Sequence, residues 1–174
     1  MRAPRDLMLL DRLEEFQGVK YSGPAWRVAK EGLDPTQGYS SGSRWDPGTF
    51  DVLYTSLEAS GAISEMRFHL SSQPVFPSKV KYELSELKVG TNNTLKLFDT
   101  ELFDRLNVSK ETYSTFDYGR TQEIGDAAQF LGFDGLIVPS ARSSAQNLVL
   151  FSDKFGPENI ALVASQTIVW EDWD

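Results

Sequence analysis

The sequence of 174 residues contains no cysteine and a single histidine, His69. Disulfide bonds are therefore excluded, and so are zinc sites built from cysteine and histidine. Cysteine nucleophiles are excluded as well, and a serine–histidine–aspartate triad would have to depend on His69. A magnesium or calcium site made of carboxylates alone stays open, but the sequence has no EF-hand spacing. We expect no metal.

Basic clusters and long apolar runs are also lacking. The chain has 17 Lys and Arg against 25 Asp and Glu, which gives a formal net charge of −8. Because no basic block is available to follow a phosphate backbone, we expect no direct contact with nucleic acid. No apolar run approaches the ~20 residues of a membrane span, and the first residues lack the apolar core of a signal peptide. The expected location is the cytoplasm, with no membrane contact.

Aromatic residues, by contrast, are plentiful: the chain has 11 Phe, 6 Tyr and 4 Trp, and 40% of its residues are hydrophobic. This is enough material for a packed core in a chain of about one domain. Short helix and strand patterns follow one another without the βαβ rhythm of a doubly wound fold, and neither a dinucleotide-binding glycine motif nor a P-loop is present. We therefore predict one α+β domain over residues 1–174.

Local patterns predict helices over residues 6–16, 55–70, 100–106 and 121–131. In the first helix, Leu7, Leu10 and Leu13 form an apolar stripe, and Gly18 is the expected stop. Thr55 and Glu58 form a capping box that would open the second helix. The expected core stripe of that helix is Ala59, Ala62, Ile63, Met66 and Leu70. Gly132 is expected to end the last helix.

Predicted strands cover residues 25–29, 52–55, 79–84, 95–98, 135–138, 148–151 and 160–170. The clearest alternation is in residues 79–84, where Val80, Tyr82 and Leu84 would face inward. Residues 31–50 are rich in Gly, Ser, Pro and Asp and have no periodicity. They predict a loop longer than a plain connection needs, as is common for loops that carry function.

Two candidate sites lie in and just after this loop. Arg44 and Trp45 are framed by glycines, which permit close backbone approach, and arginine offers a planar fork for a phosphate or carboxylate. Alternatively, Arg44 is solvent-exposed and Trp45 fills the edge of the core. Tyr54 and the hydroxyls of Thr55 and Ser56 lie where a strand leads into a helix, a place where free N–H groups meet ligands. Ordinary strand packing and helix capping are the alternatives there.

Two further candidates lie later in the chain. Glu65 is in the middle of the predicted helix, and Gly61, one turn earlier, leaves its carboxylate little covered and hints at close approach by another group. A solvated glutamate is the alternative. Ser140 follows an apolar strand and enters a loop rich in Ser and Arg. Because it has no histidine to activate it unless His69 reaches, it would orient a ligand or act only as a turn hydroxyl.

Four segments in this order resemble the RES domain, a family named for an arginine, a glutamate and a serine: SGSRWDPG (41–48), VLYTS (52–56), ASGAISEM (59–66) and GFDGLIVPSAR (132–142) followed by NLVLF (147–151). The resemblance covers residues 26–151 and implies a single RES domain, with an N-terminal helix at about 6–17 before it. It implies an ADP-ribosyltransferase-like core of short mixed or antiparallel strands with inserted and flanking helices.

The resemblance implies a site made of Arg44, Tyr54, Glu65 and Ser140 as catalytic residues. It also places Arg27 at a first-strand position where ADP-ribosyltransferase folds often carry a phosphate-binding arginine. The predicted ligand-binding residues are Arg27, Arg44, Trp45, Tyr54, Ser56, Ser140 and Asn147. Family members often have Asn where this chain has Asp46, and because both residues suit a turn, we interpret this change as minor.

The chemistry that the resemblance implies is cleavage of the nicotinamide–ribose bond of NAD⁺, with NAD⁺ as substrate and no metal. Glu65 would stabilise the positive charge that develops on the ribose, as in glycoside hydrolysis, while the arginines bind the pyrophosphate. The acceptor could be water, phosphate or a protein side chain. The favoured function is a bacterial toxin that depletes NAD⁺, and the alternative is ADP-ribosylation of a specific cellular protein.

The family also implies a partner, an antitoxin with an Xre-like helix-turn-helix domain that occludes the NAD⁺ pocket. We expect this antitoxin to be a separate polypeptide. A function of another class stays open: a catalytically silent module that binds a partner through its acidic, aromatic C-terminal residues 170–173.

Overall fold

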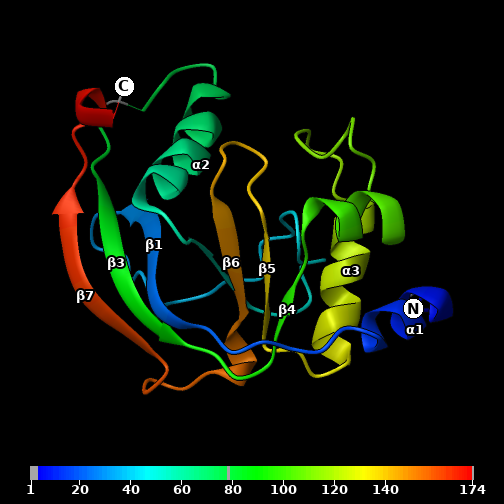
Figure 1. The fold of residues 1–174 in the computed structure, drawn as a ribbon. Coiled ribbons are helices and arrows are strands. Elements are labelled where there is room, and N and C mark those ends of the chain that lie inside the picture. Colours follow the sequence, from blue (N-terminus) through cyan, green and yellow to red (C-terminus); the bar gives the residue numbers. More distant parts are fainter. Residues whose placement is uncertain (1–3, 78, 174) are drawn as a thin grey trace.

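The computed structural model describes residues 4–77 and 79–173 and contains a seven-stranded mixed sheet flanked by helices (Figure 1). The α-helices are α1 (Leu7–Glu14), α2 (Ala59–Ser71) and α3 (Gly119–Phe130). The strands are β1 (Ser22–Lys30), β2 (Val52–Ser56), β3 (Tyr82–Gly90), β4 (Thr94–Lys96), β5 (Gly135–Pro139), β6 (Gln146–Phe151) and β7 (Ile160–Thr167). These elements confirm the predicted α+β class. No helix in the described ranges is long and apolar enough to cross a bilayer.

The strand order is β4-β5-β6-β2-β1-β3-β7, and only the β4–β5 pair is parallel. Strand β1 pairs with β3 over nine residues, and β2 pairs with β6 over five. Between β1 and β2, however, a single ladder pair joins Trp26 to Ser56. The sheet therefore consists of a four-stranded and a three-stranded half that meet at a narrow seam, with β1, β3 and β7 on one side in Figure 1.

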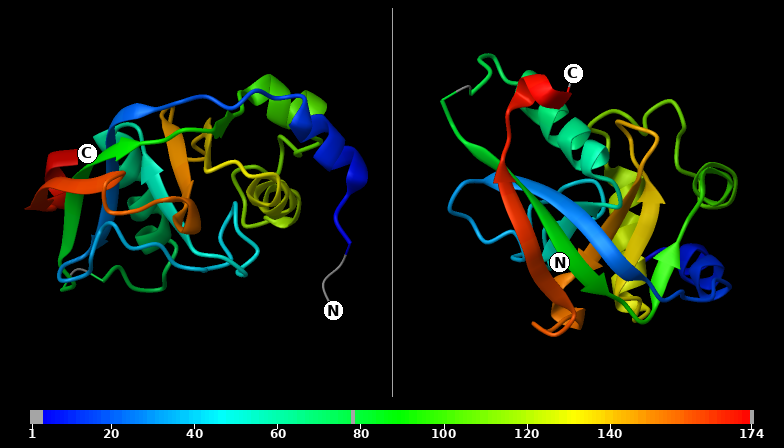
Figure 2. Two further views of the ribbon diagram at one scale, coloured as in Figure 1. Left: turned by 90° about the horizontal axis from the view of Figure 1, so that it is seen from below. Right: turned by 60° about the vertical axis from the view of Figure 1, so that its left-hand side comes forward.

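Three apolar clusters fix the helices on this sheet. Helices α1 and α3 pack with β4, β5 and β6, and their buried side chains include Leu13 and Ile124. Helix α2 packs on β1 and β3 and on the C-terminal residues through a cluster that includes Ile63 and Trp170. Figure 2 accordingly shows α1 and α3 beside the β4–β5 end of the sheet, and the C-terminus beside α2. The third cluster, around Leu53 and Leu87, joins the two halves of the sheet.

The first helix is present, but its buried face differs from the prediction. Asp6 caps it by accepting hydrogen bonds from the N–H groups of Met8 (3.0 Å) and Leu9 (3.3 Å). Leu9 and Leu13 are buried whereas Leu7 is 73% exposed, so the predicted stripe was partly wrong. Gly18 is not the stop either. The helix ends at Glu14 with ordinary right-handed backbone at its C-cap, which requires no glycine.

Helix α2 begins four residues later than predicted. The capping box was wrong because Thr55 still lies in β2, where its hydroxyl donates to the carbonyl of Leu148 (2.7 Å). Glu58 is the N-cap residue and makes no side-chain cap hydrogen bond. The predicted core stripe is confirmed: Ala62, Ile63 and Leu70 are buried, and Ala59 and Met66 pack against the same cluster.

Gly132 ends α3 as predicted. Its φ of +94° is left-handed, which glycine adopts without strain. The N–H of Gly132 donates to the carbonyl of Gln129 (3.2 Å), and the N–H of Phe133 donates to that of Ala128 (3.1 Å). This is the hydrogen-bond pattern of a Schellman motif. The helix predicted over 100–106 is a single π-helical turn, Glu101–Arg105.

Strand β3 shows the largest departure from the predicted strands. Val80 lies in a turn and is 40% exposed, so its inward placement was wrong. The strand runs to Gly90, six residues beyond the predicted end, and its first and second halves are buried on opposite faces. Tyr82 and Leu84 pack under α2, whereas Leu87 and Val89 pack in the cluster that joins the two halves. This change of face breaks the period-2 pattern. Strand β7 ends at Thr167 and not at residue 170.

Candidate active site

A cavity of about 220 Å³ lies at the seam between β1 and β2. The seam leaves room because the two strands share only one ladder pair, and α2 and the loop after residue 42 form the other walls. The lining includes seven predicted site residues: Arg27, Arg44, Trp45, Tyr54, Ser56, Glu65 and Asn147. The eighth, Ser140, adjoins the cavity through Glu65.

Glu65 has a defined orientation on α2. Its Oε1 accepts hydrogen bonds from Ser140 Oγ (2.7 Å) and Asn147 Nδ2 (3.0 Å). Its Oε2 accepts none from the described residues. A Cβ atom at Gly61 would lie 2.3 Å from Ser56 Oγ, so glycine is what lets α2 approach β2 this closely. The arrangement leaves one carboxylate oxygen available in the cavity.

Ser140 orients Glu65 and shapes its own turn. Its hydroxyl donates to Glu65, and it accepts from the N–H groups of Arg142 (3.0 Å) and Ser143 (3.2 Å). The predicted turn hydroxyl is therefore present, and the same hydroxyl orients Glu65. Its predicted contact with a ligand stays a prediction. His69 lines the same cavity but makes no hydrogen bond to Ser140 in the part of the chain that the structure describes.

Two roles were considered for the loop of Arg44 and Trp45: binding a ligand and filling the edge of the core. Trp45 has the core role, and Arg44 lies at the cavity. Trp45 is only 2% exposed and belongs to the core cluster of α1 and α3. Arg44 lines the cavity, where its Nη1 donates to the carbonyl of Tyr113 and its Nη2 to that of Thr115 (3.4 Å). Its guanidinium also lies over the ring of Tyr118, 4.8 Å from the centroid. Arg44 is thus held at the cavity with a fixed direction.

Asp46 has a larger structural role than the sequence indicates. Its carboxylate is fully buried and accepts from the N–H groups of Gly42 (2.8 Å) and Ser43 (3.1 Å) and from the Tyr54 hydroxyl (2.5 Å). Tyr54 in turn accepts from the N–H of Trp45 (3.0 Å). Both carboxylate oxygens accept hydrogen bonds. An asparagine has only one acceptor oxygen, so it could replace only one of these two acceptors.

This network determines what Tyr54 contributes. Burial, together with the hydrogen bond to Asp46, raises the pKa of the Tyr54 hydroxyl far above its ordinary value. The hydroxyl therefore stays protonated and bound to Asp46. Tyr54 lines the cavity as a neutral side chain whose hydroxyl already has both a donor and an acceptor as partners.

The other predicted ligand residues differ in availability. Ser56 is buried, and its hydroxyl accepts from the N–H of Glu58 (3.2 Å) at the start of α2. Asn147 gives its amide N–H to Glu65, and its buried Oδ1 has no hydrogen-bond partner among the described residues. Arg27 donates to the carbonyl of Gln37 (3.1 Å), and burial lowers its pKa.

The charge of the cavity is opposite to that of the chain. Arg27, Arg44 and Arg142 all line it, and none of them forms an ion pair with a carboxylate of the described residues. Three arginines elsewhere, Arg5, Arg105 and Arg120, do form ion pairs, as Arg5 does with Asp126 at 2.9 Å. Sequence reasoning missed Arg142, although it lies two residues after Ser140 in the same loop. Unpaired guanidinium groups in a cavity indicate an anionic ligand.

The fold and this cavity define an α+β protein with an arginine-lined pocket and one oriented carboxylate. The RES domain family model matches residues 24–171, so the chain belongs to the RES domain family and the resemblance is confirmed. A chain in the crystal structure of the M. tuberculosis MbcT–MbcA toxin–antitoxin complex has a similar fold, with a TM-score of 0.86 at 20% sequence identity. The match covers 97% of this chain and 96% of that one. No curated protein matches.

Proposed function

We propose that this protein is the toxin of a toxin–antitoxin pair, and that it binds NAD⁺ at the seam and breaks the nicotinamide–ribose bond. One observation carries the proposal: a single carboxylate, Glu65, is oriented by two side chains in a cavity whose three arginines have no carboxylate partner in the described part of the chain. NAD⁺ fits this combination because it carries a pyrophosphate and a bond that breaks with positive charge on a sugar. Membership of the RES family and the toxin–antitoxin complex of similar fold agree with it.

In this mechanism, each residue has a separate task. Arg44 and Arg27 bind the pyrophosphate through charge-assisted hydrogen bonds. Glu65 offers its second oxygen to a ribose hydroxyl and stabilises the positive charge as nicotinamide leaves with the bonding electron pair. Ser140 and Asn147 hold Glu65 in place. An acceptor nucleophile then forms the new bond to the ribose carbon and gives up its proton. With water or phosphate as acceptor, the result is depletion of NAD⁺.

A second candidate is transfer of ADP-ribose to a protein, and a groove beside the cavity favours it. This groove, of about 610 Å³, is lined by Ser140 together with Phe98, Phe103 and Ser143. Because Ser140 also donates to Glu65, an acceptor protein bound in the groove would lie beside the residues that we propose act on NAD⁺. The groove therefore offers a protein acceptor a docking place next to the NAD⁺ cavity.

The proposed partner is a separate antitoxin with a helix-turn-helix domain. The similar fold found in a toxin–antitoxin complex supports a separate antitoxin as the partner. A carboxylate-bearing segment of the antitoxin in the cavity would pair with its arginines and would exclude NAD⁺. Occlusion of the cavity is therefore the inhibition that we propose.

The test is incubation of the purified protein with NAD⁺ labelled in its adenylate half, alone, with phosphate and with cell lysate. We expect free nicotinamide and labelled ADP-ribose or its phosphorylated form, and we expect Glu65→Ala to abolish turnover while its circular dichroism spectrum stays unchanged. Label fixed to one lysate protein would favour the transferase. Full activity of Glu65→Ala would refute the role of Glu65 in the mechanism. No turnover in any arm would refute the proposed activity and favour a silent binding module.

A further inference from the structure

We propose that Arg142 is a phosphate-binding residue that faces Arg44 and closes on the same anionic part of the ligand; this inference rests on the proposed function. Arg142 lines the cavity together with Arg44 and Glu65. Its position in the chain ties it to Glu65, because its backbone N–H donates to the Ser140 hydroxyl that orients Glu65. The side chain and the carboxylate are therefore placed by the same turn.

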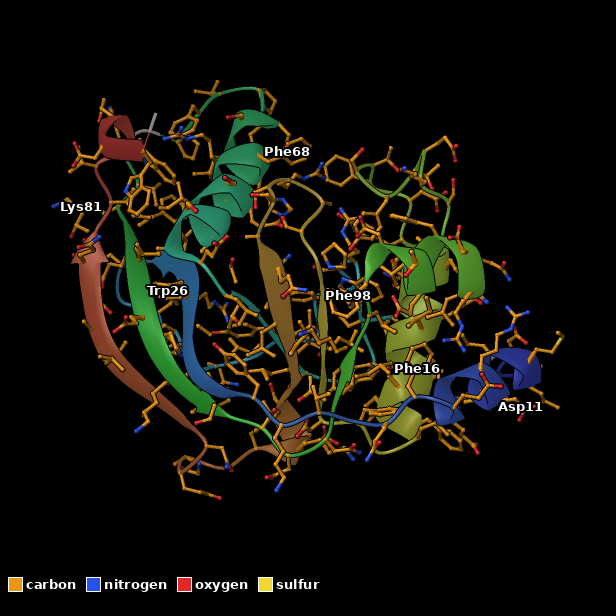
Figure 3. The ribbon with its side chains drawn as sticks, viewed as in Figure 1. Asp11, Phe16, Trp26, Phe68, Lys81 and Phe98 are labelled. Atoms are coloured by element: carbon orange, nitrogen blue, oxygen red, sulfur yellow. The ribbon has the colours of Figure 1, made fainter. Side chains whose placement is uncertain are left out.

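The guanidinium of Arg142 is held in a fixed direction on two sides. Its Nη1 donates to the carbonyl of Ser114 (2.5 Å), and its plane stacks on Phe68, with 3.4 Å between Cζ and the ring centroid. Phe68 lies on the side of α2 that faces the β5–β6 hairpin (Figure 3). The Nε and Nη2 donors make no hydrogen bond within the described ranges. A held arginine with free donors loses little entropy when it binds a phosphate.

The two arginines also share one support. Arg44 donates to the carbonyls of Tyr113 and Thr115, and Arg142 donates to that of Ser114, which lies between them. Three consecutive carbonyls thus hold two guanidinium groups at one wall of the cavity. Burial and the positive charge of Arg44 lower the pKa of Arg142, so the pair is under mutual repulsion that a bound anion would relieve.

The contact with Ser114 gives a competing explanation, in which Arg142 only holds the loop. The test distinguishes phosphate binding from loop support by comparing ligands with and without phosphate groups. Calorimetric titration compares ADP-ribose and inorganic pyrophosphate with nicotinamide riboside, which carries no phosphate. Arg12→Ala is the matched control, because Arg12 also donates to a backbone carbonyl, that of Arg105 (2.7 Å), and does not line the cavity.

We expect Arg142→Ala to weaken binding of ADP-ribose and pyrophosphate by about tenfold to a hundredfold, the range for a charge-assisted hydrogen bond. Binding of nicotinamide riboside should change less than twofold, Arg142→Lys should recover part of the loss, and Arg12→Ala should bind as wild type. Equal losses for all three ligands would show a structural role and overturn the inference.

The remaining outcomes distinguish this inference from the proposed function. If wild type binds ADP-ribose and Arg142→Ala binds it equally well, the role of Arg142 is refuted while the NAD⁺ proposal stands. If wild type binds pyrophosphate but neither binds ADP-ribose nor turns over NAD⁺ in the labelling assay, and Arg142→Ala loses the pyrophosphate binding, the anion site stands and the NAD⁺ proposal fails. If wild type binds none of the probes, both are refuted.

Discussion

Asp46→Asn is the substitution that most directly tests the network under the Arg44 loop. In the wild type, Asp46 Oδ1 accepts from Ser43 and Tyr54, while Oδ2 accepts from Gly42. An asparagine keeps one acceptor oxygen, and its amide would then face the N–H of Gly42, donor against donor. The substitution therefore removes a buried hydrogen bond to a charged acceptor and weakens the other two.

We expect Asp46→Asn to lower the free energy of unfolding by about 2 kcal/mol, because a hydrogen bond to a charged group contributes about 1.5–3 kcal/mol. Tyr54→Phe removes a hydrogen bond to the same carboxylate and should also cost about 2 kcal/mol. Since the two side chains are in contact, the double variant should lose less than the sum, with a coupling of about 1 kcal/mol. Urea unfolding followed by circular dichroism measures all three values.

Asp51→Asn is the matched control. Asp51 is exposed near the end of the same loop and accepts one hydrogen bond, from Ser40 Oγ (3.0 Å). A surface change of this kind should alter stability by no more than about 0.5 kcal/mol. If Asp46→Asn is as stable as this control, or if the losses of Asp46→Asn and Tyr54→Phe add without coupling, the buried network does not stabilise the fold.

Two further predictions concern α3 and α1. A Cβ atom at Gly125 would lie 1.8 Å from the carbonyl oxygen of Trp45, so Gly125→Ala should destabilise the protein by about 1–3 kcal/mol. Gly119→Ala is the control and should not destabilise it, because a Cβ atom there would have no contact closer than 3.7 Å. Thermal unfolding compares the two variants. Hydrogen bonds from the helix backbone lower the pKa of Asp6 in the folded state, and the N–H of Leu9 makes the largest contribution. Its contribution to stability is then present above about pH 4 and is lost as the pH falls through the lower folded-state pKa, so Asp6→Asn should flatten the pH dependence of the melting temperature below pH 4. An unchanged slope would contradict this.

Sequence reasoning found the site residues that belong to local motifs. It missed the roles that depend on contacts with residues farther away in the chain. The positions of Tyr54 and Glu65 follow from ordered motifs, and the structure brings both to one cavity. In the sequence, Asp46 has only the features of a turn residue. No local pattern indicates that its carboxylate accepts a hydrogen bond from the hydroxyl of Tyr54. Arg142 is anchored by Ser114, 28 residues away, and no local pattern reports that contact.

Secondary structure shows the same division. The Schellman motif at Gly132 depends on a few neighbouring residues and was predictable. The start of α2 was not, because Thr55 is held in β2 by a hydrogen bond to Leu148, which is far along the chain. Strand β3 was cut short because Leu84 and Leu87 pack in different clusters on opposite faces. Both of these errors lie where a tertiary contact decides the local structure.

The single ladder pair between β1 and β2 has a consequence for amide hydrogen exchange. Within the described strands, Trp26 and Ser56 form the one pair across the seam, and the N–H of Val52 donates to Tyr39 instead. We therefore expect the other backbone N–H groups on the facing edges of β1 and β2 to exchange faster than those between β1 and β3. A ligand that touches Arg27 on one side and Tyr54 on the other would tie the two halves of the sheet together. Its binding energy would then be measurable as slower exchange on both strands, including at amides that the ligand does not contact.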